Sequence, residues 1–112
     1  MWNIISSIED IELIKRRSFT RPCLIFKHST RCEISNVAKA RIESWRNNNT
    51  VDCYYLDLIK FREVSDYIAE HFHVFHESPQ ILLLSNGDCI LDASHLDIRT
   101  AEIDEVVDSL AV

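Results

Sequence analysis

The chain has 112 residues, of which 46% are hydrophobic and 27% charged, with a formal net charge of −6. That length suits a single domain spanning residues 1–112 that buries a core unaided. The scarcity of glycine and proline excludes collagen-like and low-complexity chains. The acidic balance argues against nucleic acid as a partner, because such binding rests on neutralising phosphates with clustered Lys and Arg.

The first 17 residues, MWNIISSIEDIELIKRR, do not have the pattern of a signal peptide. Acidic residues come early and interrupt the apolar runs, whereas a secretory signal needs a continuous apolar core. Elsewhere no apolar run approaches the ~20 residues of a membrane-spanning helix. We therefore expect a cytoplasmic protein without a membrane partner.

The first half of the chain predicts two helices around one short strand. Isoleucines recur at helical spacing from about residue 6 to residue 17, which is the pattern of an amphipathic helix. The apolar run PCLIF (22–26) is bounded by proline and by polar residues, so it indicates a buried strand. Apolar residues then follow a three-four spacing from about 31 to 46, and a second helix is expected to end at the three asparagines that follow.

The second half predicts further strands and helices. TVDCYYLDL (50–58) is β-branched and aromatic, as strands are, and a helix follows with an apolar face between Phe61 and Phe72. Pro79 opens a third buried strand, QILLLS. NGD (86–88) favours a tight type I′ hairpin.

The last elements complete the predicted architecture. CILDAS (89–94) would pair back antiparallel across the hairpin, and the apolar residues from Ile103 to Leu110 predict a closing amphipathic helix. The order is then α-β-α-β-α-β-β-α. Strands joined through helices imply right-handed crossovers and parallel pairing. We therefore predict an α/β fold with a central mixed four-stranded sheet flanked by helices.

The four cysteines, Cys23, Cys32, Cys53 and Cys89, form no Cys-x-x-Cys motif. Structural zinc sites use paired spacing, and a cytoplasmic chain of this size needs no disulfides. All but Cys32 lie in predicted strands among apolar neighbours, so we interpret those three as core residues. HFHVFH (71–76) matches no standard zinc pattern either; its histidines are interpreted as surface and helix-end residues, and no metal is expected.

Cys32 falls at the first turn of the helix predicted from about residue 31. Unpaired backbone N–H groups and the helix dipole favour negative charge there. A thiol in this position ionises more easily, and the thiolate is the nucleophile. Thr30 to Glu33 has the T-x-x-E form of a capping box, although a frame with Ser29 as the cap is also compatible with the sequence.

Four neighbours could act on a thiolate at Cys32. Arg31 would stabilise it and Glu33 would oppose it. Ser35, one turn on, could donate a hydrogen bond to the sulfur. His28, four residues earlier, could act as a base or a positive charge, or it could be a strand-end residue that faces away.

FKHSTRCEIS (26–35), the later SPQILLL (78–84) and the closing hairpin and helix resemble the thioredoxin superfamily. Within it, the chain is similar to the YtxJ-type monothiol bacilliredoxins, small cytoplasmic proteins with a K-H-S-T-x-C-x-I-S segment after the first core strand. The similarity covers nearly the whole chain, including the order of elements. It implies a single thioredoxin-like domain over residues 1–112.

The resemblance implies a monothiol, glutaredoxin-like thiol–disulfide oxidoreductase that acts in redox homeostasis. Cys32 would attack, and Ser35 would stand where a dithiol protein has its resolving cysteine, with Thr30 and Arg31 shaping the thiolate's surroundings. The activity would be removal of bacillithiol, or a similar low-molecular-weight thiol, from mixed disulfides on client proteins. Cys32 would be left in a mixed disulfide that a second thiol resolves. The implied partners are thiolated clients and a small thiol that serves as co-substrate, with no cofactor.

The resemblance also covers the segment before the third strand. Pro79 would be the cis-proline opposite the active cysteine, and Ser78 would offer backbone groups to a bound partner. Without the resemblance, Pro79 is a proline that starts a strand. One residue departs from the family pattern, because Glu33 stands where members usually have proline. Two alternatives therefore stay open: a thioredoxin-fold binding module of low reactivity, and a redox sensor that becomes modified at Cys32 without turning over clients.

Overall fold

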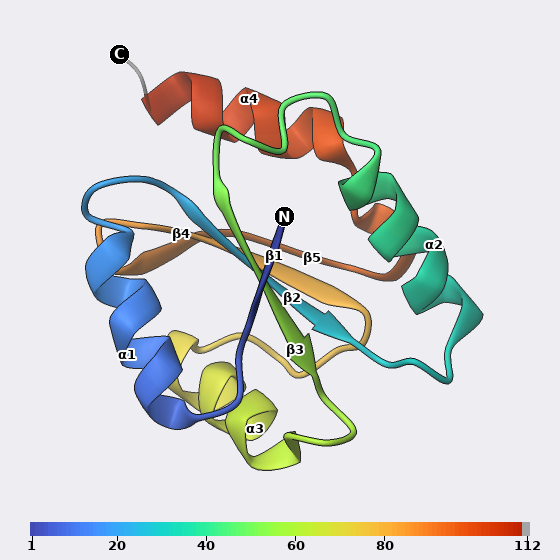
Figure 1. Ribbon diagram of the computed structural model, residues 1–112. Coiled ribbons are helices and arrows are strands. Elements are labelled where there is room, and N and C mark those ends of the chain that lie inside the picture. Colours follow the sequence, from blue (N-terminus) through green and yellow to red (C-terminus); the bar gives the residue numbers. More distant parts are fainter. Residues whose placement is uncertain (111–112) are drawn as a thin grey trace.

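A computed structural model describes residues 1–110 as helices packed on both faces of one five-stranded sheet (Figure 1). The strand order is β1-β3-β2-β4-β5. The elements are β1 (Trp2–Ile4), α1 (Ile8–Arg17), β2 (Cys23–His28), α2 (Glu33–Glu43), β3 (Asp52–Asp57), α3 (Arg62–Phe72), β4 (Gln80–Ser85), β5 (Asp88–Ser94), the 3-10 helix η1 (His95–Asp97) and α4 (Thr100–Leu110). Within residues 1–110, no helix has the length and apolar character needed to span a bilayer.

Two helices cover each face of the sheet. Successive side chains of a strand point to opposite faces, so in β2 Ile25 packs with α1 and α3, while Leu24 and Phe26 pack with α2 and α4. Ile68 of α3 and Ile42 of α2 are fully buried against these two faces. β2 is buried along its whole length, as the apolar run in the sequence predicts.

The predicted α/β class is confirmed, with one strand more than predicted. Trp2–Ile4 forms β1, which pairs in parallel with β3 at the edge of the sheet. Three residues are too few to show a period of two, so sequence patterning misses this strand. The first helix starts at Ile8 instead of residue 6, because Ser7 and Asp10 form a capping box at its N-terminus.

The parallel pairing expected for strands joined through helices is confirmed for β2 and β3 but is wrong for β4. β4 runs antiparallel to β2, with Gln80 opposite Lys27. Asp57, at the end of β3, lies opposite His28 of β2, so β4 starts at the same end of the sheet where β3 finishes. α3 and the segment 73–79 return the chain to that end instead of carrying it along the length of the sheet.

The predicted hairpin between β4 and β5 is confirmed. Asn86 and Gly87 have φ values of 52° and 81°, which is the combination that a type I′ turn requires. The Gly87 N–H donates to Ser18 Oγ over 2.8 Å, and a Cβ at this position would lie 3.1 Å from the Phe19 ring. The glycine thus serves both the turn and its contact with the end of α1.

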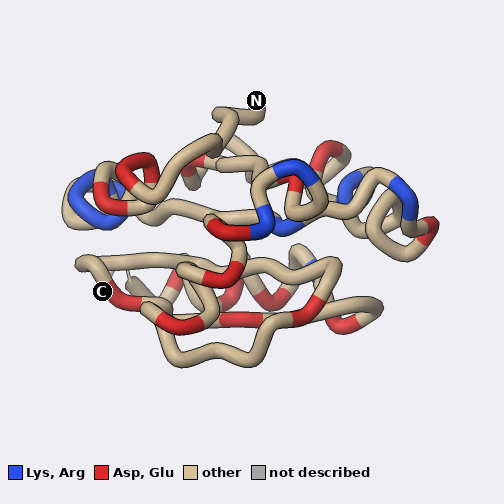
Figure 2. Tube along the Cα trace, turned by 90° about the horizontal axis from the view of Figure 1, so that it is seen from below, with Lys and Arg blue, Asp and Glu red and all other residues tan. Residues whose placement is uncertain are grey.

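Charge is distributed unevenly over the fold. After Arg62, Arg99 is the only lysine or arginine in the sequence. Figure 2 shows Asp and Glu over the part of the molecule that holds the C-terminus, and Lys and Arg mostly on the side of the N-terminus. The net negative charge therefore comes from the second half of the chain, and it gives one side of the molecule a negative field.

Candidate functional site

Cys32 lies at the junction between β2 and α2. Its N–H donates to Ser29 O over 3.2 Å, which closes a four-residue turn directly after β2. The Asn36 N–H donates to Cys32 O over 3.1 Å, as the first hydrogen bond of α2. Cys32 has an extended backbone, with φ −113° and ψ 122°, and it is the N-cap residue of the helix. Its side chain is half-buried.

The predicted capping box is wrong. Thr30 is exposed in the turn, the cap is Cys32, and within the described chain no side chain caps α2 by a hydrogen bond. The turn from Ser29 to Cys32 takes up the residues that would otherwise start the helix, so α2 begins at Glu33. Cys32 is nevertheless the residue that directly precedes the unpaired N–H groups of the first helical turn.

Ser35 is engaged by residues of β2 and of the turn. Its Oγ accepts a hydrogen bond from the Ser29 N–H over 3.1 Å and lies 2.6 Å from His28 Nδ1. Both side chains are buried, with exposed fractions of 0% for Ser35 and 2% for His28. The expectation that Ser35 bonds to the Cys32 sulfur is therefore corrected: its hydrogen bonds go to His28 and Ser29.

His28 points into the molecule toward α2, so it is not a strand-end residue facing away. Its ring packs against those of Phe26 and Tyr55, with centroids 5.4 and 5.3 Å away. Burial, reinforced by the positive charge of Lys39, lowers the pKa of His28 from its ordinary value of 6.5. The imidazole is therefore neutral at pH 7, and it does not provide the positive charge that the sequence leaves open.

The charged neighbours of Cys32 face solvent. Arg31 and Glu33 are both exposed, one on each side of the cysteine. Solvent and salt screen their effects on the sulfur. We therefore expect Arg31 and Glu33 to have only small and opposite effects on the stability of a Cys32 thiolate.

The segment before β4 reaches the same end of the sheet as Cys32. The Ser78–Pro79 peptide bond is cis, as the resemblance implies. Gln80 lies opposite Lys27, so Pro79 comes next to His28, from which the Cys32 turn departs. Pro79 is buried and its carbonyl accepts from the His95 N–H over 2.9 Å. The structure thus brings Pro79 and the turn to the same end of the sheet, and the role of Ser78 and Pro79 toward a bound partner stays a prediction.

The sequence analysis does not predict a buried lysine that lies on the other face of the sheet, against α3. Lys27 is fully buried; its Nζ donates to Ser65 O over 3.2 Å and lies 3.4 Å from His76 Nδ1. Burial lowers the pKa of Lys27 to about 8. The alternation of buried residues in β2 offers a signal for this burial, because Lys27 follows Cys23 and Ile25 at a period of two.

The histidines of residues 71–76 are only partly at the surface. His71 and His73 are exposed as expected, but His76 is half-buried, which corrects its interpretation as a surface residue.

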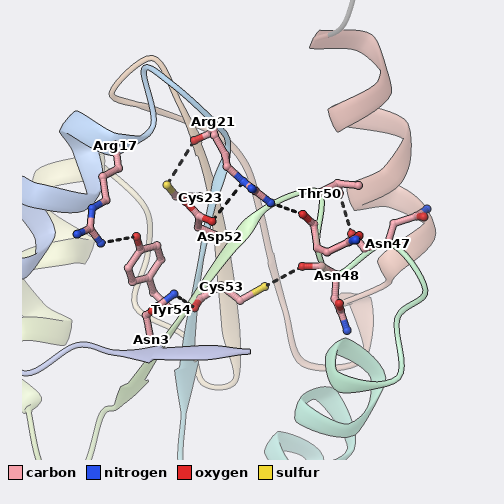
Figure 3. A network of polar contacts seen from close by, with 11 residues as sticks. Asn3, Arg17, Arg21, Cys23, Asn47, Asn48, Thr50, Asp52, Cys53 and Tyr54 are labelled. Carbon is pink, nitrogen blue, oxygen red and sulfur yellow. Dashed lines mark hydrogen bonds and ion pairs between the residues drawn. The ribbon is translucent and has the colours of Figure 1, made fainter.

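The other three cysteines lie at the opposite end of the sheet. Cys23 and Cys53 are buried, and Figure 3 shows their sulfurs directed at Arg21 O and Asn48 O, at 3.5 and 3.9 Å. Cys89 is half-buried and is opposite Leu84, which in turn is opposite Cys23. His28 lies five strand positions after Cys23, a distance of about 16 Å.

Burial keeps these three thiols in their neutral form. It raises the pKa of each one, Cys23, Cys53 and Cys89, to about 11. Within residues 1–110, which include all four cysteines, none is in a disulfide, and no group of three or more His, Cys, Asp or Glu residues is placed to hold a metal ion. The core interpretation is confirmed for Cys23 and Cys53, and Cys89 packs at the margin of the same core.

A cysteine at the N-terminus of the helix after the central strand, together with a cis-proline at the same end of the sheet, defines a thioredoxin-fold thiol protein. Residues 3–103 match the family model described as monothiol bacilliredoxin BrxC. The chain therefore belongs to the monothiol bacilliredoxin family, and its function is of the thiol redox class.

Solved structures support the same assignment. One described as a candidate oxidoreductase with a thioredoxin fold has 31% sequence identity and a TM-score of 0.84, over 93% of this chain and 91% of that one. The thioredoxin of Fasciola hepatica has 13% identity and a TM-score of 0.73, over 96% of this chain and 97% of its own. The Malassezia sympodialis thioredoxin has 15% identity and a TM-score of 0.70, over 97% and 90%. The two thioredoxins establish the fold alone.

Proposed function

We propose that this protein removes bacillithiol, or a similar low-molecular-weight thiol, from mixed disulfides on client proteins through Cys32. The observation that carries the proposal is the separation of Cys32 from the other thiols. Cys32 is half-buried at a helix N-terminus, whereas the strand cysteines lie at the far end of the sheet with pKa values of about 11. One cysteine is therefore placed to exchange with a disulfide from outside.

The first step is a thiol–disulfide exchange. The Cys32 thiolate attacks the sulfur of the small thiol, a bond forms between these two sulfurs, and the client's sulfur leaves as a thiolate. The client is reduced, and Cys32 is left in a mixed disulfide with the small thiol. Ser78 and Pro79 would hold the client's backbone in extended form during the attack, and Thr30 and Arg31 would line the approach.

The second step needs a thiol from solution. Ser35 has no sulfur to offer, and Cys23, the cysteine of β2, lies at the far end of that strand, about 16 Å from His28. A second molecule of small thiol attacks the mixed disulfide, releases Cys32 as thiolate, and leaves as a symmetric disulfide that a separate reductant must reduce. We place this cycle in the cytoplasm, where thiols stay reduced.

The test is release of bacillithiol from a model client that carries it as a mixed disulfide. We expect multiple turnovers by the wild type when bacillithiol and a reductant are supplied. The Cys32→Ser variant should fall to the uncatalysed rate, since the strand cysteines cannot replace the nucleophile. Cys89→Ser is the matched control, and it should keep wild-type activity.

Three outcomes would decide against the proposal. Activity that survives Cys32→Ser would remove Cys32 from the mechanism. A reaction that stops after one turnover, with Cys32 trapped in its mixed disulfide, would favour the redox sensor. Clients carrying glutathione or coenzyme A, assayed in parallel, identify the small thiol; failure on all of them would favour a binding module without catalysis.

A further inference from the structure

A chain of hydrogen bonds links Cys32 to the interior of the protein. The Cys32 N–H donates to Ser29 O, the Ser29 N–H donates to Ser35 Oγ, and Ser35 Oγ lies 2.6 Å from His28 Nδ1. Ser29 thus uses both of its backbone groups, one toward the cysteine and one toward Ser35. The chain joins the turn, the first turn of α2 and the last residue of β2.

The direction of the His28–Ser35 bond follows from counting protons. One lone pair of Ser35 Oγ already accepts from Ser29. A separation of 2.6 Å is short for an N–H donor and typical of an O–H donor. The neutral imidazole offers one unprotonated nitrogen as acceptor. We therefore assign the hydroxyl proton of Ser35 to the bond with His28 Nδ1, so this proton is not available to the Cys32 sulfur.

We propose that His28 is a positioning residue for Cys32, which it holds at the N-terminus of α2 by accepting the hydroxyl proton of Ser35. Without this acceptor, Ser35 turns its hydroxyl elsewhere and the hydrogen bond that ties the Ser29–Cys32 turn to Ser35 of α2 is weakened. The sulfur then spends less time beside the N–H groups that stabilise a thiolate. The inference rests on the proposed function only in taking Cys32 as the nucleophile.

Because His28 and Ser35 are buried, neither side chain can easily replace the other with a different hydrogen-bond partner. Both side chains are almost fully buried, and the imidazole packs against the rings of Phe26 and Tyr55. A buried polar pair that loses one partner leaves the other unsatisfied. The opposite face of the sheet offers a matched pair for comparison: Ser65 is also fully buried, and its Oγ lies 3.2 Å from His76 Nδ1.

The experiment measures alkylation of Cys32 by iodoacetamide against pH, with the modified residue identified by peptide mass mapping. His28→Leu and Ser35→Ala should each slow alkylation at pH 7 by about threefold to fivefold, the effect of weakening one helix N-terminus on a negative group. The whole rate profile should move to higher pH. His28→Asn, which keeps a polar atom at the position of Nδ1, should stay within about twofold of wild type. The double variant should be no slower than either single one, because both act through one bond.

Ser65→Ala is the control for a general loosening of the fold. It removes a buried serine hydroxyl that contacts a histidine, as Ser35→Ala does, so it should lower the free energy of unfolding in urea by a similar amount. It should leave the alkylation profile of Cys32 unchanged. If His28→Leu does not fold, Ser35→Ala and His28→Asn still test the proposal.

A wild-type profile in Ser35→Ala would overturn the inference, as would an equal slowing in Ser65→Ala or additive effects in the double variant. The assay contains neither bacillithiol nor a client. A protein that fails to release bacillithiol but shows the expected alkylation pattern therefore contradicts the proposed function and leaves the role of His28 intact. Normal release together with unchanged alkylation in the variants contradicts only the role of His28.

Discussion

The two ends of the central sheet differ in what they bury. At the end that carries Cys32, β2 finishes with Lys27 and His28, both buried and both hydrogen-bonded to helices, on opposite faces. At the other end, Cys23 and Cys53 lie in the core as neutral thiols. Burying polar groups is unfavourable unless they are paired. The presence of two such groups at the end that carries Cys32 therefore indicates a functional role for that end in addition to a structural one.

The comparison also shows that position decides what a cysteine can do. The same thiol group is kept protonated by burial in the strands, and is half-exposed beside unpaired N–H groups at the start of α2. Reactivity therefore depends on the fold around the residue and not on the residue type.

The largest effect is expected in the alkylation rates of the four cysteines. At pH 8, a thiol with a pKa of about 11 is ionised to roughly one part in a thousand. We expect iodoacetamide to modify Cys32 at least ~100-fold faster than Cys23, Cys53 or Cys89, as measured by peptide mass mapping over time. The same measurement in urea should show four similar rates. Rapid labelling of any strand cysteine in the folded protein would break the comparison.

A smaller effect is expected when the buried cation is removed by Lys27→Met. In the folded protein the pKa of Lys27 lies at about 8, below its ordinary value of 10.5. Between these values the unfolded chain binds more protons than the folded one, so Lys27 makes the wild type more stable as pH rises from 8 to 10.5. The variant lacks this term.

We therefore expect Lys27→Met to raise the free energy of unfolding by about 1 kcal/mol at pH 6, and the difference to shrink between pH 8 and 10.5, in urea titrations. Lys60→Met, at an exposed position, is the control and should show no such pH dependence. A loss of stability at pH 6 in Lys27→Met would mean that the buried lysine stabilises the fold, and the contrast between the two ends would then be weaker.

The smallest effect concerns the charge next to the cysteine. Glu33 is exposed and is the first residue of α2, a position that proline suits. Glu33→Gln and Glu33→Pro should both raise the alkylation rate of Cys32 at low salt by about twofold, because a surface charge is worth a few tenths of a kcal/mol, and salt should remove the gain. Glu63→Gln, in the first turn of α3, should have no effect. If the alkylation rate rises only in Glu33→Pro, the backbone conformation at residue 33, and not its charge, affects Cys32.

Much of the fold is predictable because the relevant signals are local. Residues 23–28, 52–57 and 80–85 form strands within one or two positions of the predicted ranges, since apolar runs and β-branched residues record burial along the chain. The Asn-Gly hairpin is equally local, because it depends on the φ values of two adjacent residues. The cap of α2 is harder to predict, since a turn and a helix begin with similar polar residues, and Cys32 stands where the sequence suggests Thr30 or Ser29.

Sequence patterns alone predict the type and order of most elements, the isolation of Cys32 at a helix N-terminus and the family resemblance. Tertiary structure alone decided that β1 joins the sheet, that β4 runs antiparallel to β2, and that Lys27 meets His76 across 49 positions. It also decided that Ser35 bonds to His28 and not to the Cys32 sulfur. The physical reason is that periodicity records which face of an element is buried, whereas the partner of a buried polar group is set only when separate segments pack together.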